Sequence, residues 1–167
     1  INFMAYESLK YKVLLKEKQF EIREYESFVS MGVSNAYGGG FSKLFNYITG
    51  YNNRSQKIAM TTPVITNTKK QDMKFTMPKD VAESGYPEPL DKSITIVKED
   101  LKIVASFSFK GSFIGSFRNI KEHNKSLIKF IKEHGYTIKS DLLLMTYNGP
   151  YTPAPLKKYD LAYEIIK

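Results

Sequence analysis

The sequence contains no cysteine. Disulfide bridges, zinc ribbons, iron–sulfur clusters, thiolate nucleophiles and covalent attachment of a c-type haem are therefore excluded, because each of them requires cysteine sulfur. Because cysteine usage is the usual indicator of the redox compartment, the sequence does not indicate that compartment. A chain of 167 residues is nevertheless long enough to form a single domain with an apolar core that needs no covalent cross-link.

Long apolar runs are lacking as well. No stretch approaches the roughly 18–20 apolar residues that span a bilayer, and no signal peptide is visible. The chain begins at Ile1 rather than at methionine, which leaves open a targeting segment upstream. With 42% hydrophobic and 25% charged residues, the composition is that of a globular chain, and we expect a soluble, cytoplasmic protein.

Arginine is scarce, since Arg23, Arg54 and Arg118 are three of 25 basic residues. The net charge of +8 could attract nucleic acid, an anionic membrane or an acidic ligand. Recognition of bases and phosphates favours guanidinium over ammonium groups, and the lysines are scattered along the chain. We therefore expect a lysine-rich, solvated surface and no nucleic-acid partner.

Histidine is limited to His123 and His134. On one helix these residues would lie on the same stripe but roughly 16 Å apart along the axis, too far to bind one metal ion. The sequence has no HExxH spacing, Walker loop or dinucleotide fingerprint, and the glycine run at 38–40 is expected to form a turn. We expect solvent-facing and capping roles for both histidines, and no metal site.

The chain does contain a regular succession of strand and helix patterns. In the first half, strands are predicted over residues 11–15, 20–25, 29–33, 57–65 and 73–77. A helix is predicted over residues 41–49, ending at Gly50 as a left-handed cap. Its apolar stripe, at spacings i, i+3, i+4 and i+7, consists of Phe41, Leu44, Phe45 and Ile48.

The second half repeats this order after a proline-rich stretch, residues 78–91, that predicts a long loop. Strands are predicted over residues 94–98, 102–109, 142–147 and 160–166, with a helix over residues 117–133. We interpret the chain as one domain built from two βαββ repeats, at about 11–77 and 94–167. Because neither sheet can cover both of its faces alone, the repeats should share one core. The concave face between them is the expected ligand site.

Two glutamates on predicted strands are candidates for a functional role. Glu24 shares a predicted strand face with Phe20 and Ile22, so it is either a buried carboxylate that needs a partner or the exposed end of the strand. Glu164 alternates with Ala162 and Ile166, and the same two possibilities apply to it.

Four segments together resemble the SOUL haem-binding protein family. They are FEIREY at 20–25, FSKLFNYITG at 41–50, KIAMTTPV at 57–64 and YNGP at 147–150, and they extend over nearly the whole chain in order. The resemblance implies an α+β fold, a twisted, distorted antiparallel β-barrel of two βαββ repeats with a helix on each side. It also indicates a related architecture in the GyrI-like effector-binding domains.

The resemblance implies non-covalent binding of haem or another tetrapyrrole on an apolar patch, without catalysis. The residues expected to contact it are Phe41, Leu44, Phe45, Ile48, Met60 and Tyr147. Some family members have a histidine as candidate iron ligand where this chain has Glu24, and a basic residue where it has Asn46. Haem is therefore expected as a cofactor held mainly by apolar contact, with weak iron ligation.

The GyrI-like likeness implies an alternative function. In that case a hydrophobic or cationic small molecule would be sensed or hydrolysed in a pocket between the repeats. The residues of this alternative pocket are Glu24, Tyr25, Tyr163 and Glu164. Both functions require a small-molecule partner, and the sequence does not indicate the physiological ligand or the oligomeric state.

Overall fold

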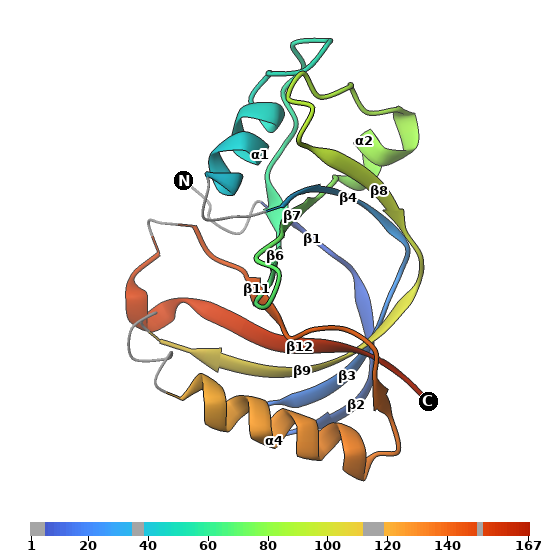
Figure 1. Ribbon diagram of the computed structural model, residues 1–167, viewed down its shortest axis with the longest axis vertical. Helices are drawn as coiled ribbons and strands as arrows, with labels where there is room; N and C mark the ends of the chain where they lie inside the picture. Colours follow the sequence, from blue (N-terminus) through green and yellow to red (C-terminus); the bar gives the residue numbers. More distant parts are fainter. Residues whose placement is uncertain (1–5, 35–38, 112–118, 150–151) are drawn as a thin grey trace. The chain divides into compact units, whose positions relative to one another are not determined.

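The computed structural model describes residues 6–34, 39–111, 119–149 and 152–167. It confirms the predicted α+β class: helices pack on sheets whose strand pairs are antiparallel, apart from one short parallel pair. The chain divides into two compact units (Figure 1). Unit 1 comprises Ile1–Leu9 and Ser27–Asp100, and unit 2 comprises Lys10–Glu26 and Leu101–Lys167.

Unit 1 contains one four-stranded sheet in the order β6-β7-β4-β8 and the parallel pair β1-β5. Its elements are β1 (Glu7–Ser8), β4 (Phe28–Val33), α1 (Gly40–Ile48), β5 (Thr61–Thr62), β6 (Val64–Asn67), β7 (Met73–Thr76), α2 (Lys79–Ser84) and β8 (Thr95–Glu99). Helix α1 starts after Gly39, whose φ of 90° is accessible to glycine at little cost. It packs on β4 and β7 and buries Leu44, Tyr47 and Ile48.

Unit 2 contains a five-stranded antiparallel sheet in the order β2-β3-β9-β12-β11, and the short β10 pairs with the end of β12. Its elements are β2 (Tyr11–Glu17), β3 (Phe20–Tyr25), β9 (Lys102–Lys110), α4 (Ile120–Glu133), β10 (Thr137–Ile138), β11 (Leu143–Thr146), the 3-10 turn η3 (Ala154–Leu156) and β12 (Lys158–Ile166). Helix α4 lies along one face of this sheet (Figure 1). It packs Leu127, Phe130 and Ile131 against apolar side chains of β3, β9 and β12.

Several boundaries differ from those predicted. The strand expected over 57–65 is divided into β5 and β6 at the cis bond between Thr62 and Pro63. The stretch 78–91, predicted as a loop, contains α2. The helix predicted over 117–133 is described from Ile120 onwards, while Phe117 and the predicted turn residue Gly38 lie outside the described residues. In the part of the chain that the structure describes, no helix has the length and apolar character needed to cross a membrane.

The core of unit 2 gives a direct test of this packing. Leu161 on β12 is fully buried beneath α4, and truncating such a leucine removes apolar contact and leaves a cavity. We expect Leu161→Ala to lower the free energy of unfolding by about 2–5 kcal/mol in urea denaturation. Leu156→Ala, at a side chain that is 62% exposed, should change it by less than about 0.5 kcal/mol. Equal effects of the two changes would contradict the assigned core.

Candidate functional site

The first candidate surface is an aromatic pair on helix α1, formed by Phe41 and Phe45. The side chains are 45% and 46% exposed. Their rings stack with centroids 5.9 Å apart and planes inclined by 12°. Phe41 also meets the buried ring of Phe75 edge to face, at 5.3 Å, which fixes one side of the pair. The result is an aromatic surface that the described residues leave half open to solvent.

The other residues of the predicted apolar patch have different environments. Leu44 and Ile48 are buried in the core of unit 1, where they hold α1 on its sheet. Met60 is half-buried and packs against the same core. Tyr147 belongs to unit 2. The structure therefore places Phe41 and Phe45 at the surface, with Leu44 and Ile48 as their support.

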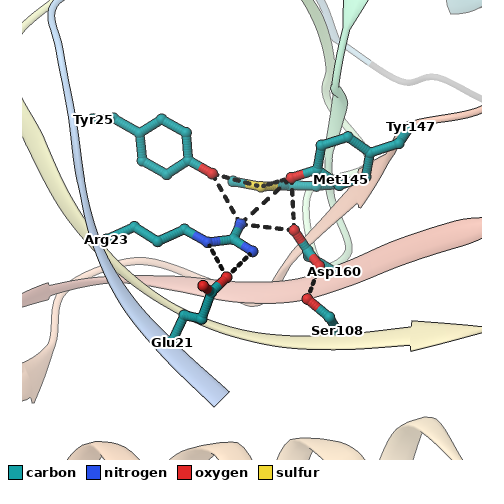
Figure 2. A network of polar contacts seen from close by, with 7 residues as sticks. All are labelled: Glu21, Arg23, Tyr25, Ser108, Met145, Tyr147 and Asp160. Carbon is teal, nitrogen blue, oxygen red and sulfur yellow. Dashed lines mark hydrogen bonds and ion pairs between the residues drawn. The ribbon is translucent and has the colours of Figure 1, made fainter. Parts of the chain in front are cut away.

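The second candidate surface is the face of the unit 2 sheet opposite α4. Strand β3 turns Phe20 and Ile22 toward the apolar cluster under α4, so Glu21, Arg23 and Tyr25 point to the other side. We call the group formed around them the polar cluster. Its members, drawn in Figure 2, are Glu21, Arg23, Tyr25, Ser108, Met145, Tyr147 and Asp160.

Arg23 lies at the centre of the polar cluster and its side chain is fully buried. Its Nε and Nη2 donate hydrogen bonds to Glu21 Oε1 at 3.0 and 2.7 Å. Its Nη1 donates to Asp160 Oδ2 at 2.7 Å and to the Tyr25 hydroxyl at 3.0 Å. The guanidinium also lies over the ring of Tyr11, 4.4 Å from its centroid. The planar group is thus engaged at its edges and on one face.

Asp160 on β12 accepts further hydrogen bonds of the polar cluster. Its Oδ2 accepts a hydrogen bond from the Tyr147 hydroxyl at 2.6 Å, and its Oδ1 accepts one from Ser108 Oγ at 2.5 Å. The hydroxyl of Tyr25 lies 3.9 Å from the Met145 sulfur, completing the group. Because Asp160 is fully buried, these contacts replace the water that its carboxylate gives up on folding.

The electrostatics of the polar cluster are dominated by burial. Burial disfavours the charged form of Arg23, but the adjacent tyrosine oxygens and the Asp160 carboxylate hold its pKa above the usual range. Burial raises the pKa of Tyr25 to about 12 and that of Tyr147 further, so both hydroxyls remain protonated at neutral pH. One guanidinium and two carboxylates leave the cluster with a formal charge of −1.

A buried hydroxyl without a partner lies beside this cluster. Ser106 on β9 is opposite Glu21 on one side and Ala162 on the other. Its side chain is fully buried, and in the described part of the chain its Oγ is the one buried side-chain polar atom without a hydrogen-bond partner. An unsatisfied buried hydroxyl costs about 1–3 kcal/mol, so a bound water or ligand group would be favourable there.

The four residues of the predicted alternative pocket lie on both faces of the unit 2 sheet. Tyr25 and Glu164 are on the face of the polar cluster, where Glu164 forms an ion pair with Lys102 at 2.7 Å. Glu24 lies on the α4 face, opposite Ile103. The hydroxyl of Tyr163 donates to Asn124 of α4 at 2.6 Å. The sheet thus separates Glu24 and Tyr163 from Tyr25 and Glu164.

His123 in α4 and His134, which follows this helix, also differ in environment. His134 follows the helix as its C-cap, where Nδ1 lies 2.8 Å from the Phe130 carbonyl oxygen and Nε2 lies 3.2 Å from Glu17 Oε1. The hydrogen bond with the Phe130 carbonyl raises the pKa of His134. Burial lowers the pKa of His123 instead. Among the described residues, no group of three or more His, Cys, Asp or Glu side chains could hold a metal ion.

A family model for SOUL heme-binding proteins matches residues 6–164. The chain belongs to the SOUL family. This assignment supports ligand binding as the general role of the protein. A comparison with curated proteins finds no match, so the assignment depends on the family model and on the four sequence segments that it covers.

Solved structures with the same fold are distant in sequence. A chain of the EcmrR–DNA complex aligns with a TM-score of 0.65 and 10% identity over 89% of this SOUL protein, which spans 57% of that chain. A conserved protein from Listeria innocua aligns with a TM-score of 0.63 and 10% identity, covering 90% of this chain and 93% of that one. A hydrolase from the same organism has a TM-score of 0.57 and 10% identity, with 92% and 94% covered. These similarities establish the fold alone.

Sequence reasoning did not select Arg23, Asp160 or Ser106 as site residues. A usable signal was present, because Glu21, Arg23 and Tyr25 occupy one whole face of a strand whose other face is mainly apolar. A strand face that carries a glutamate, an arginine and a tyrosine and is nevertheless buried needs a polar partner surface. The identity of that partner, a carboxylate 137 residues away, is not visible in the local pattern.

Removing one partner of the buried ion pair between Arg23 and Asp160 should lower the stability of the protein. Replacing Asp160 with alanine leaves Arg23 with Glu21 as its remaining carboxylate partner and removes acceptors from Tyr147 and Ser108. We expect Asp160→Ala to lower the free energy of unfolding by about 3 kcal/mol or more. As control, Lys125→Ala removes an exposed partner 3.7 Å from Glu122 and should cost less than about 0.5 kcal/mol. A loss below 1 kcal/mol for Asp160→Ala, measured by denaturant titration, would argue against a structural role.

Proposed function

We propose that this SOUL protein binds haem or another tetrapyrrole non-covalently and without catalysis, and that the aromatic pair on α1 contacts the macrocycle. The observation that carries the proposal is the pair itself: two nearly parallel phenylalanine rings, each half exposed, on a helix whose other apolar side chains are buried. A flat, apolar macrocycle can cover both rings at once. Family membership supports the same class of ligand.

The exposure of the pair has an energetic consequence. Burying a phenylalanine side chain stabilises a protein by about 1.5–3 kcal/mol relative to leaving it in water. The pair forgoes part of this gain on folding, since the helix directs the two rings outward. A planar ligand that covers the rings would recover it as binding free energy. Leu44 and Ile48, buried in the core of unit 1, anchor the helix that carries the two rings.

Metal-free protoporphyrin IX is the probe for this surface, because its binding cannot depend on iron ligation. We expect it to quench tyrosine fluorescence saturably, and we expect Phe45→Asp to weaken binding by about tenfold, or 1.4 kcal/mol, since a carboxylate would be desolvated against the macrocycle. Leu156→Asp is the matched control at another exposed apolar residue and should leave affinity unchanged. Equal affinities of the wild type and Phe45→Asp would refute the assignment of α1 as the contact surface.

The polar cluster favours a second candidate function, the binding of a small organic cation on the face of the unit 2 sheet opposite α4. The specific observation is its formal charge of −1 together with the unpartnered hydroxyl of Ser106. The partly exposed ring of Tyr11 could add cation–π attraction. Glu21, whose side chain is 12% exposed, would supply the counter-charge for such a ligand.

Thermal denaturation can distinguish cation binding from tetrapyrrole binding. A ligand that binds the folded state at 100 times its Kd stabilises it by about 2.7 kcal/mol. We expect benzyltrimethylammonium to raise Tm in the wild type more than its neutral isostere, neopentylbenzene, and we expect Glu21→Gln to abolish the difference. If the cation and the isostere have the same effect on wild-type Tm, the cation function is excluded and tetrapyrrole binding is unaffected.

A further inference from the structure

The outer side of helix α4 carries four lysines that the proposed function does not use. They are Lys121, Lys125, Lys129 and Lys132, and all four are exposed. With 3.6 residues per turn, they fall within about 80° of one another around the helix axis and extend over about 16 Å along it. We call this group the lysine stripe. Figure 1 shows α4 lying along one face of the unit 2 sheet, so the stripe on its other side is open within that unit.

The carboxylates beside the lysine stripe neutralise it only in part. Lys125 lies 3.7 Å from Glu122, and Lys129 lies 3.8 Å from Glu133. Both distances are long for ion pairs, and the four side chains are 58–77% exposed, so water and salt screen the attraction. Within the ranges that the structure describes, the other two lysines of the stripe have no ion pair with a carboxylate. The outer side of α4 therefore keeps a net positive charge.

The lysine stripe belongs to the unit that carries nearly all of the net charge. Unit 2 has 16 Lys and Arg residues against 9 Asp and Glu residues, whereas unit 1 has 9 against 8. Almost the whole net charge of +8 therefore belongs to unit 2. Another cation lies past the C-terminal end of α4, where the Lys167 ammonium is 5.0 Å from the centroid of the Tyr136 ring. A field of one sign attracts an anionic partner before contact is made.

The chemistry of the lysine stripe favours an anionic lipid surface over a nucleic acid as its partner. The stripe contains no arginine, although recognition of bases and phosphates relies on the planar guanidinium fork. Ammonium groups act as hydrated point charges without a fixed geometry, and the headgroups of a fluid bilayer can move beneath them. Clusters of about four to eight basic residues on a helix are typical of contact with anionic lipid.

The apolar side of α4 is not available for insertion into a bilayer. Leu127, Phe130 and Ile131 are buried against the sheet of unit 2, whereas a helix that inserts at a membrane interface needs its apolar side free. Contact through the lysine stripe is therefore peripheral and electrostatic, with the helix lying on the headgroups. Such contact weakens as salt is added, because the Debye length is about 10 Å at 0.1 M and shortens further at higher ionic strength.

We propose that the lysine stripe of α4 docks this protein on the surface of an anionic lipid bilayer. The stripe belongs to unit 2 and helix α1 belongs to unit 1, so docking uses other residues than the proposed tetrapyrrole contact. The proposal does not depend on tetrapyrrole binding and applies to the protein without added ligand. Each lysine near an anionic surface adds a similar increment of affinity, so changes in the stripe should have graded effects.

The test measures co-sedimentation of the full chain, at low ionic strength, with vesicles of equal parts phosphatidylserine and phosphatidylcholine. We expect binding to these vesicles and none to vesicles of phosphatidylcholine alone. Lys125→Glu/Lys129→Glu reverses the charge at the centre of the stripe and should weaken binding by at least about tenfold. Lys69→Glu/Lys70→Glu is the matched control, since it changes the net charge equally at exposed lysines of unit 1, and it should retain most of the affinity.

Two further double variants separate the effect of charge from an effect on folding. Lys125→Arg/Lys129→Arg keeps both charges and should keep the binding. Lys125→Gln/Lys129→Gln removes two charges without placing new carboxylates beside Glu122 and Glu133, and it should weaken binding to an intermediate degree. Circular dichroism and Tm establish that each variant is folded. Added salt should release the wild-type protein from the vesicles.

Three outcomes would overturn the proposal. The first is wild-type protein that stays in the supernatant with the phosphatidylserine vesicles at low salt. The second is an equal loss of binding in the stripe variant and in the unit 1 control, which would assign the attraction to net charge rather than to α4. The third is binding to duplex DNA that Lys125→Glu/Lys129→Glu removes, with no binding to vesicles, which would assign the stripe to nucleic acid.

Discussion

The buried ion pair between Arg23 and Asp160 is the constraint on which the rest of unit 2 depends. It joins β3 to β12 across β9, which lies between them. Both side chains are fully buried, so each would carry a large desolvation penalty without the other. A slip of β3 by one residue would turn Arg23 toward α4 and Ile22 away from it. The pair therefore fixes the register, and the register determines which side chains form the core under α4.

The same constraint explains the chemical division of the sheet. Ile22, Leu161 and Tyr163 pack under α4, so the opposite face holds Arg23 and Asp160 with their hydroxyl partners. Buried charges are weak contributors to stability, since well-packed apolar residues can replace them with little loss. The polar cluster keeps a formal charge of −1 and lies beside the Ser106 hydroxyl, which has no partner among the described residues. Its presence is therefore better explained by the specificity of strand pairing than by a contribution to the free energy of unfolding.

Much of the local structure was accessible from the sequence. The period of two in residues 20–25 identified β3 and the sides to which its residues point, and the stripe of residues 41–48 identified α1. The four motif segments identified the family, which the model over residues 6–164 confirms. These features depend on neighbours within a few residues, and local patterns report them directly.

The sequence provided much less information on which strands lie next to each other in the sheets. Strand β3 pairs with β9, about 80 residues later, and β4 pairs with β8 and β7 rather than with β3. Alternation defines the faces of a strand but not the strand beside it. For this reason Glu24 and Glu164 were grouped in one predicted pocket although the sheet places them on opposite faces. Asp160, the partner of Arg23, could be found only once the order β3-β9-β12 was known.

Helix α1 shows a similar limit at the level of single side chains. Phe41, Leu44, Phe45 and Ile48 form one stripe in sequence, yet the structure buries Leu44 and Ile48 and leaves the two phenylalanines half exposed. The stripe is wider than the strip of helix surface that the sheet can cover, so one edge must remain outside. In this chain the outer edge carries the two largest side chains of the stripe. Each could contribute about 1.5–3 kcal/mol if buried, a large amount for a protein whose total stability is about 5–15 kcal/mol. The fold forgoes this stabilisation at the outer edge of the stripe, and this exposed aromatic edge is the surface that we propose for a planar ligand.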